Sequence, residues 1–309
     1  MTTQSVRSLA FSALLALAPW CALAADAPNP VEPVKLADRI YTFTNTGSNS
    51  TAIVGDEAVI LVDAGNTPEQ GTQLLAAIAT LTPKPVRVLV NTHWHFDHVN
   101  GNEPLGLAGA TVVAHREVRT RMIAEKDREV GPGFPTLAYK NASLALPSIT
   151  FDRELTLHSG DEQIVLRHPA AGQVHTDGDT VVFYRRANIV HTGDLFFNDV
   201  YPYIDVAAGG WIDGLIAGCR EILARIDDKT IVVPGHGPTT DKKRLEAYVA
   251  MLEGISAKVT ALVQAGKTLA EVQAAKPTAD YDAVWGQSWN KPEAFTALAY
   301  NGIVAHTKK

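Results

Sequence analysis

The sequence predicts an α/β fold in which two β-sheets pack together and helices cover their outer faces. Short runs rich in β-branched residues occur in two separate halves of the chain, and each half ends in helical patterns. The composition agrees, because 46% of the 309 residues are hydrophobic and 19% are charged. This balance excludes disordered, collagenous and disulfide-framework proteins.

The first 24 residues predict a secretory signal peptide. Arg7 is their only charged side chain, an apolar run covers residues 9–18, and Ala22-Leu23-Ala24 places small residues before a cleavage site. The apolar run has about half of the ~20 residues that a membrane span needs. We therefore expect export to a bacterial periplasm without a stable membrane anchor. An uncleaved anchor and a buried N-terminal helix are the alternatives.

We expect residues 25–309 to form a single domain. Its first part predicts a strand meander followed by strands and helices in alternation. Thr67 and Pro68 are typical of a helix start, and residues 86–91 predict a strand buried on both faces. The predicted strands are 39–45, 51–55, 58–63, 86–91 and 111–114, and the predicted helices are 67–80 and 115–128.

The second part begins with a long irregular loop over residues 131–147, which contains three prolines and two glycines. Loops of this length often form a wall or lid of a site. The predicted strands that follow are 151–157, 163–168, 180–184, 188–191 and 230–233. A helix is predicted over residues 211–226, and the chain after the last strand is largely helical.

Imidazole and carboxylate side chains cluster directly after the buried strand 86–91. His93, His95, Asp97 and His98 lie within six residues. His93 and His95 share a side of an extended segment, whereas Asp97 and His98 can turn toward a second position. One histidine is usually a satisfied core or surface residue, but clustered, desolvated imidazoles need a cation. The cluster therefore predicts a metal site.

Three further ligand-type residues, His175, Asp194 and His236, stand in glycine-rich turns near predicted strand ends. Each alone is equally a turn former or a helix cap. Together with the cluster they bring the set to five histidines and two aspartates, enough for two divalent metals that share one carboxylate. This mixed donor set suits zinc, with iron and manganese as alternatives.

In these motifs the sequence resembles the metallo-β-lactamase superfamily. The matching stretches are THWHFDH at 92–98, GQVHT at 172–176, TGD at 192–194 and PGHG at 234–237. The resemblance implies an αβ/βα sandwich with the site at one edge. The implied ligands are His93, His95 and His175 for the first metal, Asp97, His98 and His236 for the second, and Asp194 as the bridge.

The HxHxDH motif with a bridging aspartate looks more like the glyoxalase II, lactonase and general hydrolase branches than like the lactamases that place a cysteine at the second metal. Cys219, the one cysteine left after signal cleavage, lies in a predicted helix, matches no ligand position and has no disulfide partner.

The resemblance and the donor set together predict an exported hydrolase of ester-like or amide-like bonds with two zinc ions per chain. A hydroxide shared by the metals would attack the carbonyl, and Asp97 would carry a proton to the leaving group. The predicted periplasmic location makes β-lactams the first substrate to consider. Lactones and thioesters are the alternatives, followed by an iron-dependent oxidoreductase of the persulfide dioxygenase type, which the full set of seven ligands disfavours.

The net charge of −6 and the lack of a basic run disfavour a nucleic-acid partner, so we expect a small-molecule substrate. The sequence does not indicate an oligomeric state.

Some residues allow two interpretations each. Tyr201 or Tyr203 supplies a hydroxyl to the substrate or packs in its loop, and Asp63 orients a ligand histidine or forms a turn. His191 is expected to be structural despite its closeness to Asp194. The aromatic residues that either line a pocket or belong to the core are Trp94, Phe96, Phe196 and Phe197.

Overall fold

The computed structural model describes residues 30–125, 137 and 139–307. The predicted signal peptide lies outside these residues, as does the first part of the predicted loop over residues 131–147.

The first sheet has seven strands, ordered in space as they are in the chain. Neighbouring strands are antiparallel from β1 to β4 and parallel from β4 to β7, so the sheet is mixed. Its strands are β1 (Pro33–Ala37), β2 (Ile40–Thr46), β3 (Ser48–Val54), β4 (Val59–Val62), β5 (Val86–Asn91), β6 (Thr111–His115) and β7 (Ile149–Phe151).

The second sheet has six strands in the order β13-β12-β11-β10-β9-β8. Only the β11–β12 pair is parallel among these strands. The strands are β8 (Glu154–Ser159), β9 (Glu162–Arg167), β10 (Val181–Tyr184), β11 (Ile189–His191), β12 (Ile231–Val233) and β13 (Thr240–Asp241).

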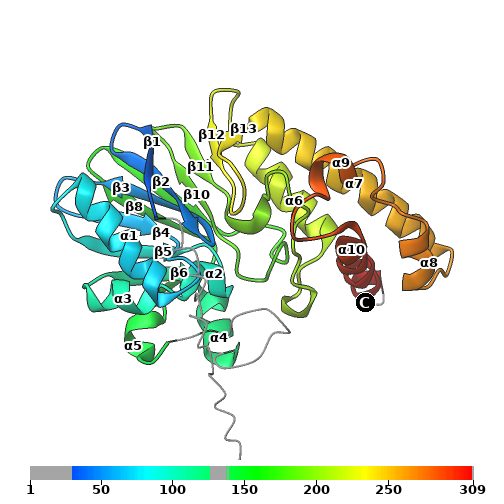
Figure 1. Cartoon of the computed structure of the whole chain (residues 1–309), viewed down its shortest axis with the longest axis horizontal. Helices are drawn as coiled ribbons and strands as arrows, with labels where there is room; N and C mark the ends of the chain where they lie inside the picture. The colour runs from blue at the N-terminus through cyan, green and yellow to red at the C-terminus, as the bar shows by residue number, and fades with distance from the viewer. Residues whose placement is uncertain (1–29, 126–136, 138, 308–309) are drawn as a thin grey trace, which may run out of the picture.

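The helices lie on the outer faces of the two sheets (Figure 1). Those of the first half are α1 (Pro68–Leu81), α2 (Phe96–Val99), α3 (Asn102–Leu107), α4 (Arg116–Glu125) and α5 (Ala142–Ala145). Those of the second half are α6 (Ile212–Leu223), α7 (Lys242–Gln264), α8 (Leu269–Ala274), α9 (Asp282–Trp285) and α10 (Pro292–Thr307), with short 3₁₀ turns η1 (Gly193–Leu195) and η2 (Val206–Ala208).

Strand alternation explains the layers. Successive side chains of a strand point to opposite faces. In β4, Val59 and Leu61 pack with α1, whereas Ile60 and Val62 face the second sheet. The same alternation in β10 sends Val182 toward the first sheet and Phe183 toward the outer helices. Both sheets are thus buried on two faces, which confirms the predicted αβ/βα sandwich.

One predicted strand was wrong in an informative way. The run 151–157 is split between the two sheets, because Phe151 pairs with His115 in the first sheet and Glu154 pairs with Arg167 in the second. A continuous β-type pattern does not reveal that the chain crosses from one sheet to the other. The elements that the sequence did not predict are β1, β13, α2, α3 and α5, all short or at sheet edges.

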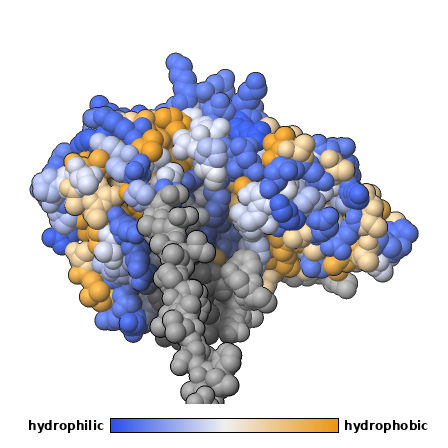
Figure 2. Space-filling view, in the orientation of Figure 1, coloured by the Kyte–Doolittle hydropathy of each residue, from blue (hydrophilic) through white to orange (hydrophobic). Residues whose placement is uncertain are grey.

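On the face drawn in Figure 2, hydrophobic residues are scattered among hydrophilic ones. Among the described residues, no helix is long and apolar enough to cross a membrane. Cys219 is a buried free thiol in α6, and its sulfur donates to the Leu195 carbonyl at 3.1 Å. Burial raises its pKa, so this cysteine serves packing rather than chemistry.

Candidate metal centre

The structure brings together all seven residues that the sequence predicts as metal ligands. They form two adjacent groups, in each of which one donor atom per residue lies within 4.8 Å of the others. The groups are His93, His95, His175 and Asp194, and Asp97, His98 and His236. Both sheets contribute, because the cluster follows β5 and Asp194 and His236 follow β11 and β12.

Asp194 lies between the two groups. Its Oδ2 is 3.7 Å from Nε2 of His93 and 3.7 Å from Nε2 of His175 in the first group. Toward the second group, Oδ1 is 3.2 Å from Nε2 of His98 and Oδ2 is 3.4 Å from Nε2 of His236. One carboxylate therefore reaches four imidazoles, the position that a shared ligand would take.

The buried donor atoms at the centre have no hydrogen-bond partner. They are Nε2 of His93, His98 and His175 and Oδ1 of Asp194. Buried polar groups are nearly always hydrogen-bonded, and leaving several unpaired in one place is costly. Four unpaired atoms that can bind a metal and that face one another therefore fit a divalent cation.

Asp63 holds the second group from behind. Its Oδ2 lies 2.8 Å from Nδ1 of His98 and 2.7 Å from the Thr92 hydroxyl, and its Oδ1 accepts the Thr92 N–H at 2.8 Å. Asp63 is buried and has a left-handed backbone, with φ of 60°. These contacts decide between the two interpretations of Asp63. It orients His98, a predicted ligand, and leaves Nε2 of this histidine directed at Asp194.

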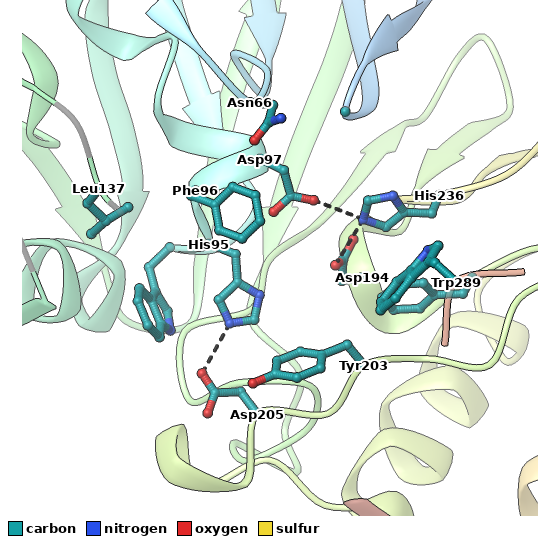
Figure 3. A pocket seen from close by; sticks show the side chains of 13 residues that line it. Asn66, His95, Phe96, Asp97, Leu137, Asp194, Tyr203, Asp205, His236 and Trp289 are labelled. Carbon is teal, nitrogen blue, oxygen red and sulfur yellow. Dashed lines mark hydrogen bonds and ion pairs between the residues drawn. The ribbon is translucent and has the colours of Figure 1, made fainter. Parts of the chain in front are cut away.

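Two further carboxylates, which the sequence did not predict at the site, hold the first group. Asp179 Oδ1 is 3.1 Å from Nδ1 of His175, and Asp205 Oδ2 is 3.1 Å from Nε2 of His95. Because Nε2 of His95 is paired with Asp205, Nδ1 is the ring nitrogen of His95 that is left to bind a metal (Figure 3). Asp179 follows His175 by only four residues, and this short spacing could have indicated the pair. Asp205 is 110 residues from His95, so nothing in the sequence indicated that they meet.

The carboxylates make the centre attractive to cations. Burial alone would lower the pKa of His236, but Asp194 and Asp97 outweigh it and raise the pKa to about 10. Burial would raise the pKa of Asp97, but His98 and His236 lower it to about 2. Desolvation, supported by the neighbouring His98, lowers the pKa of His93, so its imidazole stays neutral as a ligand requires.

Two glycines leave room for Asp194. Gly193 has a left-handed backbone, with φ of 51°, at the turn that presents the carboxylate. At Gly235 a Cβ atom would overlap Oδ1 of Asp194 and contact the Gly193 backbone. Gly193 of TGD is therefore required by the backbone conformation of its turn, and Gly235 of PGHG by the packing of its turn against that one.

A cavity of about 250 Å³ opens over the centre (Figure 3). Its polar floor includes His95, Asp97, Asp194 and His236, and its remaining walls are largely aromatic. The residues that complete it are Gly47, Asn66, Trp94, Phe96, Leu137, Phe197, Tyr203, Asp205 and Trp289. Its size suits part of a small molecule rather than a polymer.

The two tyrosines differ in position. Tyr203 lines the cavity, with its ring centroid 5.7 Å from that of His95. Tyr201 is buried instead, and its hydroxyl donates to Asp282 at 2.9 Å and to the Thr278 carbonyl at 3.2 Å. Of the two interpretations of Tyr201, packing fits this position, because the C-terminal segment packs against it and its hydroxyl is bonded there.

The aromatic residues with two interpretations divide in the same way. Trp94, Phe96 and Phe197 line the cavity, whereas Phe196 is in the core beside Tyr248. The indole N–H of Trp94 is buried without a hydrogen-bond partner. His191 is structural as expected, since its Nε2 lies 3.1 Å from the Asn49 carbonyl.

Comparison with known proteins agrees with this geometry. The family model described as the metallo-beta-lactamase superfamily matches residues 43–236, more than half of the chain. The chain belongs to the metallo-β-lactamase superfamily. The predicted metal-dependent hydrolase is confirmed at this family level.

Proteins with diverse names are similar to this chain. The 2,4-dinitroanisole O-demethylase subunit alpha of Nocardioides is 24% identical over 76% of this chain and 66% of its own length. A probable metallo-hydrolase of Streptococcus pyogenes is 27% identical over 65% of this chain and 85% of its own. A solved metallo-beta-lactamase from Pontibacter korlensis superposes with a TM-score of 0.60 at 24% identity, over 72% of this chain and 99% of its own, and so shows the shared fold.

Proposed function

We propose that this metallo-β-lactamase superfamily member is an exported hydrolase of ester-like or amide-like bonds that works with two zinc ions. The observation that carries the proposal is the position of Asp194 between two groups of ligand-type side chains, which include three buried imidazole nitrogens without a partner, beneath an open cavity. The first ion would be held by His93, His95 and His175, the second by Asp97, His98 and His236, and both by Asp194. Bound zinc supplies a Lewis acid and lowers the pKa of water to about 7.

The chain's own residues would then position the substrate and move a proton to the leaving group. Asp97 lies 3.1 Å from Nε2 of His236 and also lines the cavity, so its carboxylate can accept a proton from attacking water and deliver it to the leaving group. Tyr203 lines the same cavity and is the candidate donor to the carbonyl oxygen.

The proposed periplasmic location indicates the order in which substrate classes should be assayed. A periplasmic enzyme meets β-lactams, so these are the first class to assay, followed by lactones and thioesters. The alternative of an iron-dependent oxidoreductase is favoured less, because two adjacent ligand groups exceed what one iron needs.

The first experiment is metal analysis of the purified mature protein together with hydrolysis of a chromogenic cephalosporin. About two zinc ions per chain with turnover that a chelator abolishes would support a β-lactamase. Two zinc ions without turnover would direct the assays to lactones and thioesters, and one iron per chain would overturn the hydrolase proposal.

His95→Ala is expected to abolish turnover while the fold survives. The substitution removes a donor from the first group and leaves Asp205 without its partner, but it adds no bulk at the mouth of the cavity. We expect activity to fall by about 10³-fold or more, with unchanged circular dichroism. His158→Ala, at a histidine outside both ligand groups, is the matched control and should stay active. Full activity of His95→Ala would contradict the ligand assignment.

The export proposal has its own test. Expression of the full chain in a Gram-negative host should release a periplasmic protein whose N-terminal residue is Ala25, measured by intact mass and N-terminal sequencing. Leu14→Arg interrupts the apolar run and should keep the chain in the cytoplasm at full length. A full-length wild-type chain in the membrane fraction would contradict the proposed cleavage.

A further inference from the structure

Trp289 is exposed in a segment where the other large aromatic side chains are buried. Its exposed fraction is 52%, against 4% for Trp285 and 0% for Phe295. An exposed tryptophan forgoes much of the stabilisation that burial of so large an apolar surface provides. Trp289 lines the cavity over the candidate metal centre, so its exposed ring is available to contact a bound substrate.

The backbone around Trp289 is fixed to the wall of the cavity. The neighbouring Asn290 is buried, and its amide donates to the carbonyls of Tyr201 at 3.2 Å and Pro202 at 2.7 Å. Tyr201 in turn donates its N–H to the Trp285 carbonyl at 2.9 Å. Residues 285–290 are thus tied to the loop that carries Tyr203, and the tryptophan is presented beside the site on a fixed support.

Trp289 continues an aromatic wall that starts at a proposed metal ligand. The Phe197 ring stacks on His236 with centroids 5.0 Å apart, and the Trp289 ring lies 6.5 Å from Phe197. Figure 3 shows His236 and Trp289 on one side of the cavity, with Phe96 and Leu137 on the other. None of the described residues that line the cavity is a lysine or arginine. The walls therefore fit an uncharged, flat apolar group.

We propose that Trp289, backed by the buried ring of Phe197, forms a subsite for an aromatic substituent of the substrate, placed next to the bond that is cleaved, and that Trp289 determines this preference. The inference rests on the proposed function in one respect, namely that the substrate has an ester-like or amide-like bond that is cleaved at the centre. Trp289 lies beyond residue 236, where the family match ends, so the C-terminal segment supplies specificity to a centre built by the matched part.

Binding of N-phenyl-1-naphthylamine, a neutral aromatic fluorescent probe, tests the subsite without any turnover. We expect the zinc-loaded protein to bind one probe per chain, Trp289→Ala to bind it at least about fivefold more weakly, and Trp289→Phe to bind it within about twofold of the wild type. Val284→Ala is the matched control, since Val284 is 48% exposed in the same segment but does not line the cavity.

Kinetics test the preference in whichever class is hydrolysed, with a pair of substrates that differ only in a phenyl group. Trp289→Ala should lower the ratio of kcat/KM for the aryl over the alkyl substrate by about tenfold, mainly through KM, and Trp289→Phe should restore most of it. An unchanged ratio together with unchanged probe binding would overturn the subsite. Loss of probe binding in Trp289→Ala, in a protein that hydrolyses none of the classes, would support the subsite and reject the proposed hydrolase.

Discussion

Replacing Asp194 by alanine is expected to lower the bound metal from about two ions per chain to one or none, and to reduce turnover by about 10³-fold or more. Its carboxylate lies 3.2 to 3.7 Å from the Nε2 atoms of four histidines in both ligand groups. Without Asp194, the first group has no carboxylate among its members, and the second group has only that of Asp97. Mutual repulsion of two cations would then be screened by one negative charge fewer.

The measurement is zinc per chain after dialysis against a defined free zinc concentration, paired with the initial rate. Asp194→Asn separates charge from shape, because it keeps the side-chain volume beside Gly235 and removes the negative charge. Asp213→Asn is the matched control, since Asp213 is a carboxylate in α6 that bonds Ser256 outside both ligand groups. Two zinc ions per chain in Asp194→Ala would exclude the bridging role.

The residues that gather at this centre were predictable because their signals are local. His93 to His98 carry four donors within six residues, and the remaining donors stand in turns that need glycine. Gly235 illustrates why the turn chemistry is readable, since a side chain there would strike Asp194. The sandwich was predictable for a related reason, because strands buried on both faces have apolar runs that stand out in the sequence.

The residues that the sequence could not reveal act over long separations. Asp205 meets His95 from 110 positions away, and Trp289 reaches the cavity from the far end of the chain. The two interpretations of Tyr201 could not be separated for the same reason, because its partner Asp282 is 81 positions away. Side-chain chemistry and spacing identify what can bind a metal, but only packing shows which neighbour supports a ligand and which aromatic ring faces solvent.

Two substitutions of Asp63 are expected to separate its structural role from its role at the metal. Asp63→Ala removes an acceptor from Thr92 and His98 in a fully buried site, and alanine also tolerates the left-handed backbone poorly. We expect the free energy of unfolding of the metal-free protein to fall by about 2–4 kcal/mol. Urea unfolding in the presence of a chelator measures this loss.

Asp63→Asn should leave most of that stability in place and still weaken the metal. Asparagine accepts the left-handed conformation, and its carbonyl can still take the Thr92 N–H. Its amide, however, would donate to Nδ1 of His98 and so move the imidazole proton to Nε2, the atom directed at Asp194. A protonated Nε2 cannot bind a metal, so zinc affinity at the second group should fall about 10- to 100-fold.

Competition with a chromogenic zinc chelator measures the affinity of both variants, and Asp152→Asn, at an exposed carboxylate that pairs with Arg116, serves as the matched control. If Asp63→Asn kept wild-type zinc affinity, the proton on His98 would be set by something other than Asp63. If Asp63→Asn were as unstable as Asp63→Ala, the negative charge itself, rather than the acceptor for Thr92, would be what stabilises this part of the fold. Weak zinc binding in a stable Asp63→Asn protein is the combination that the geometry of Asp63, Thr92 and His98 predicts.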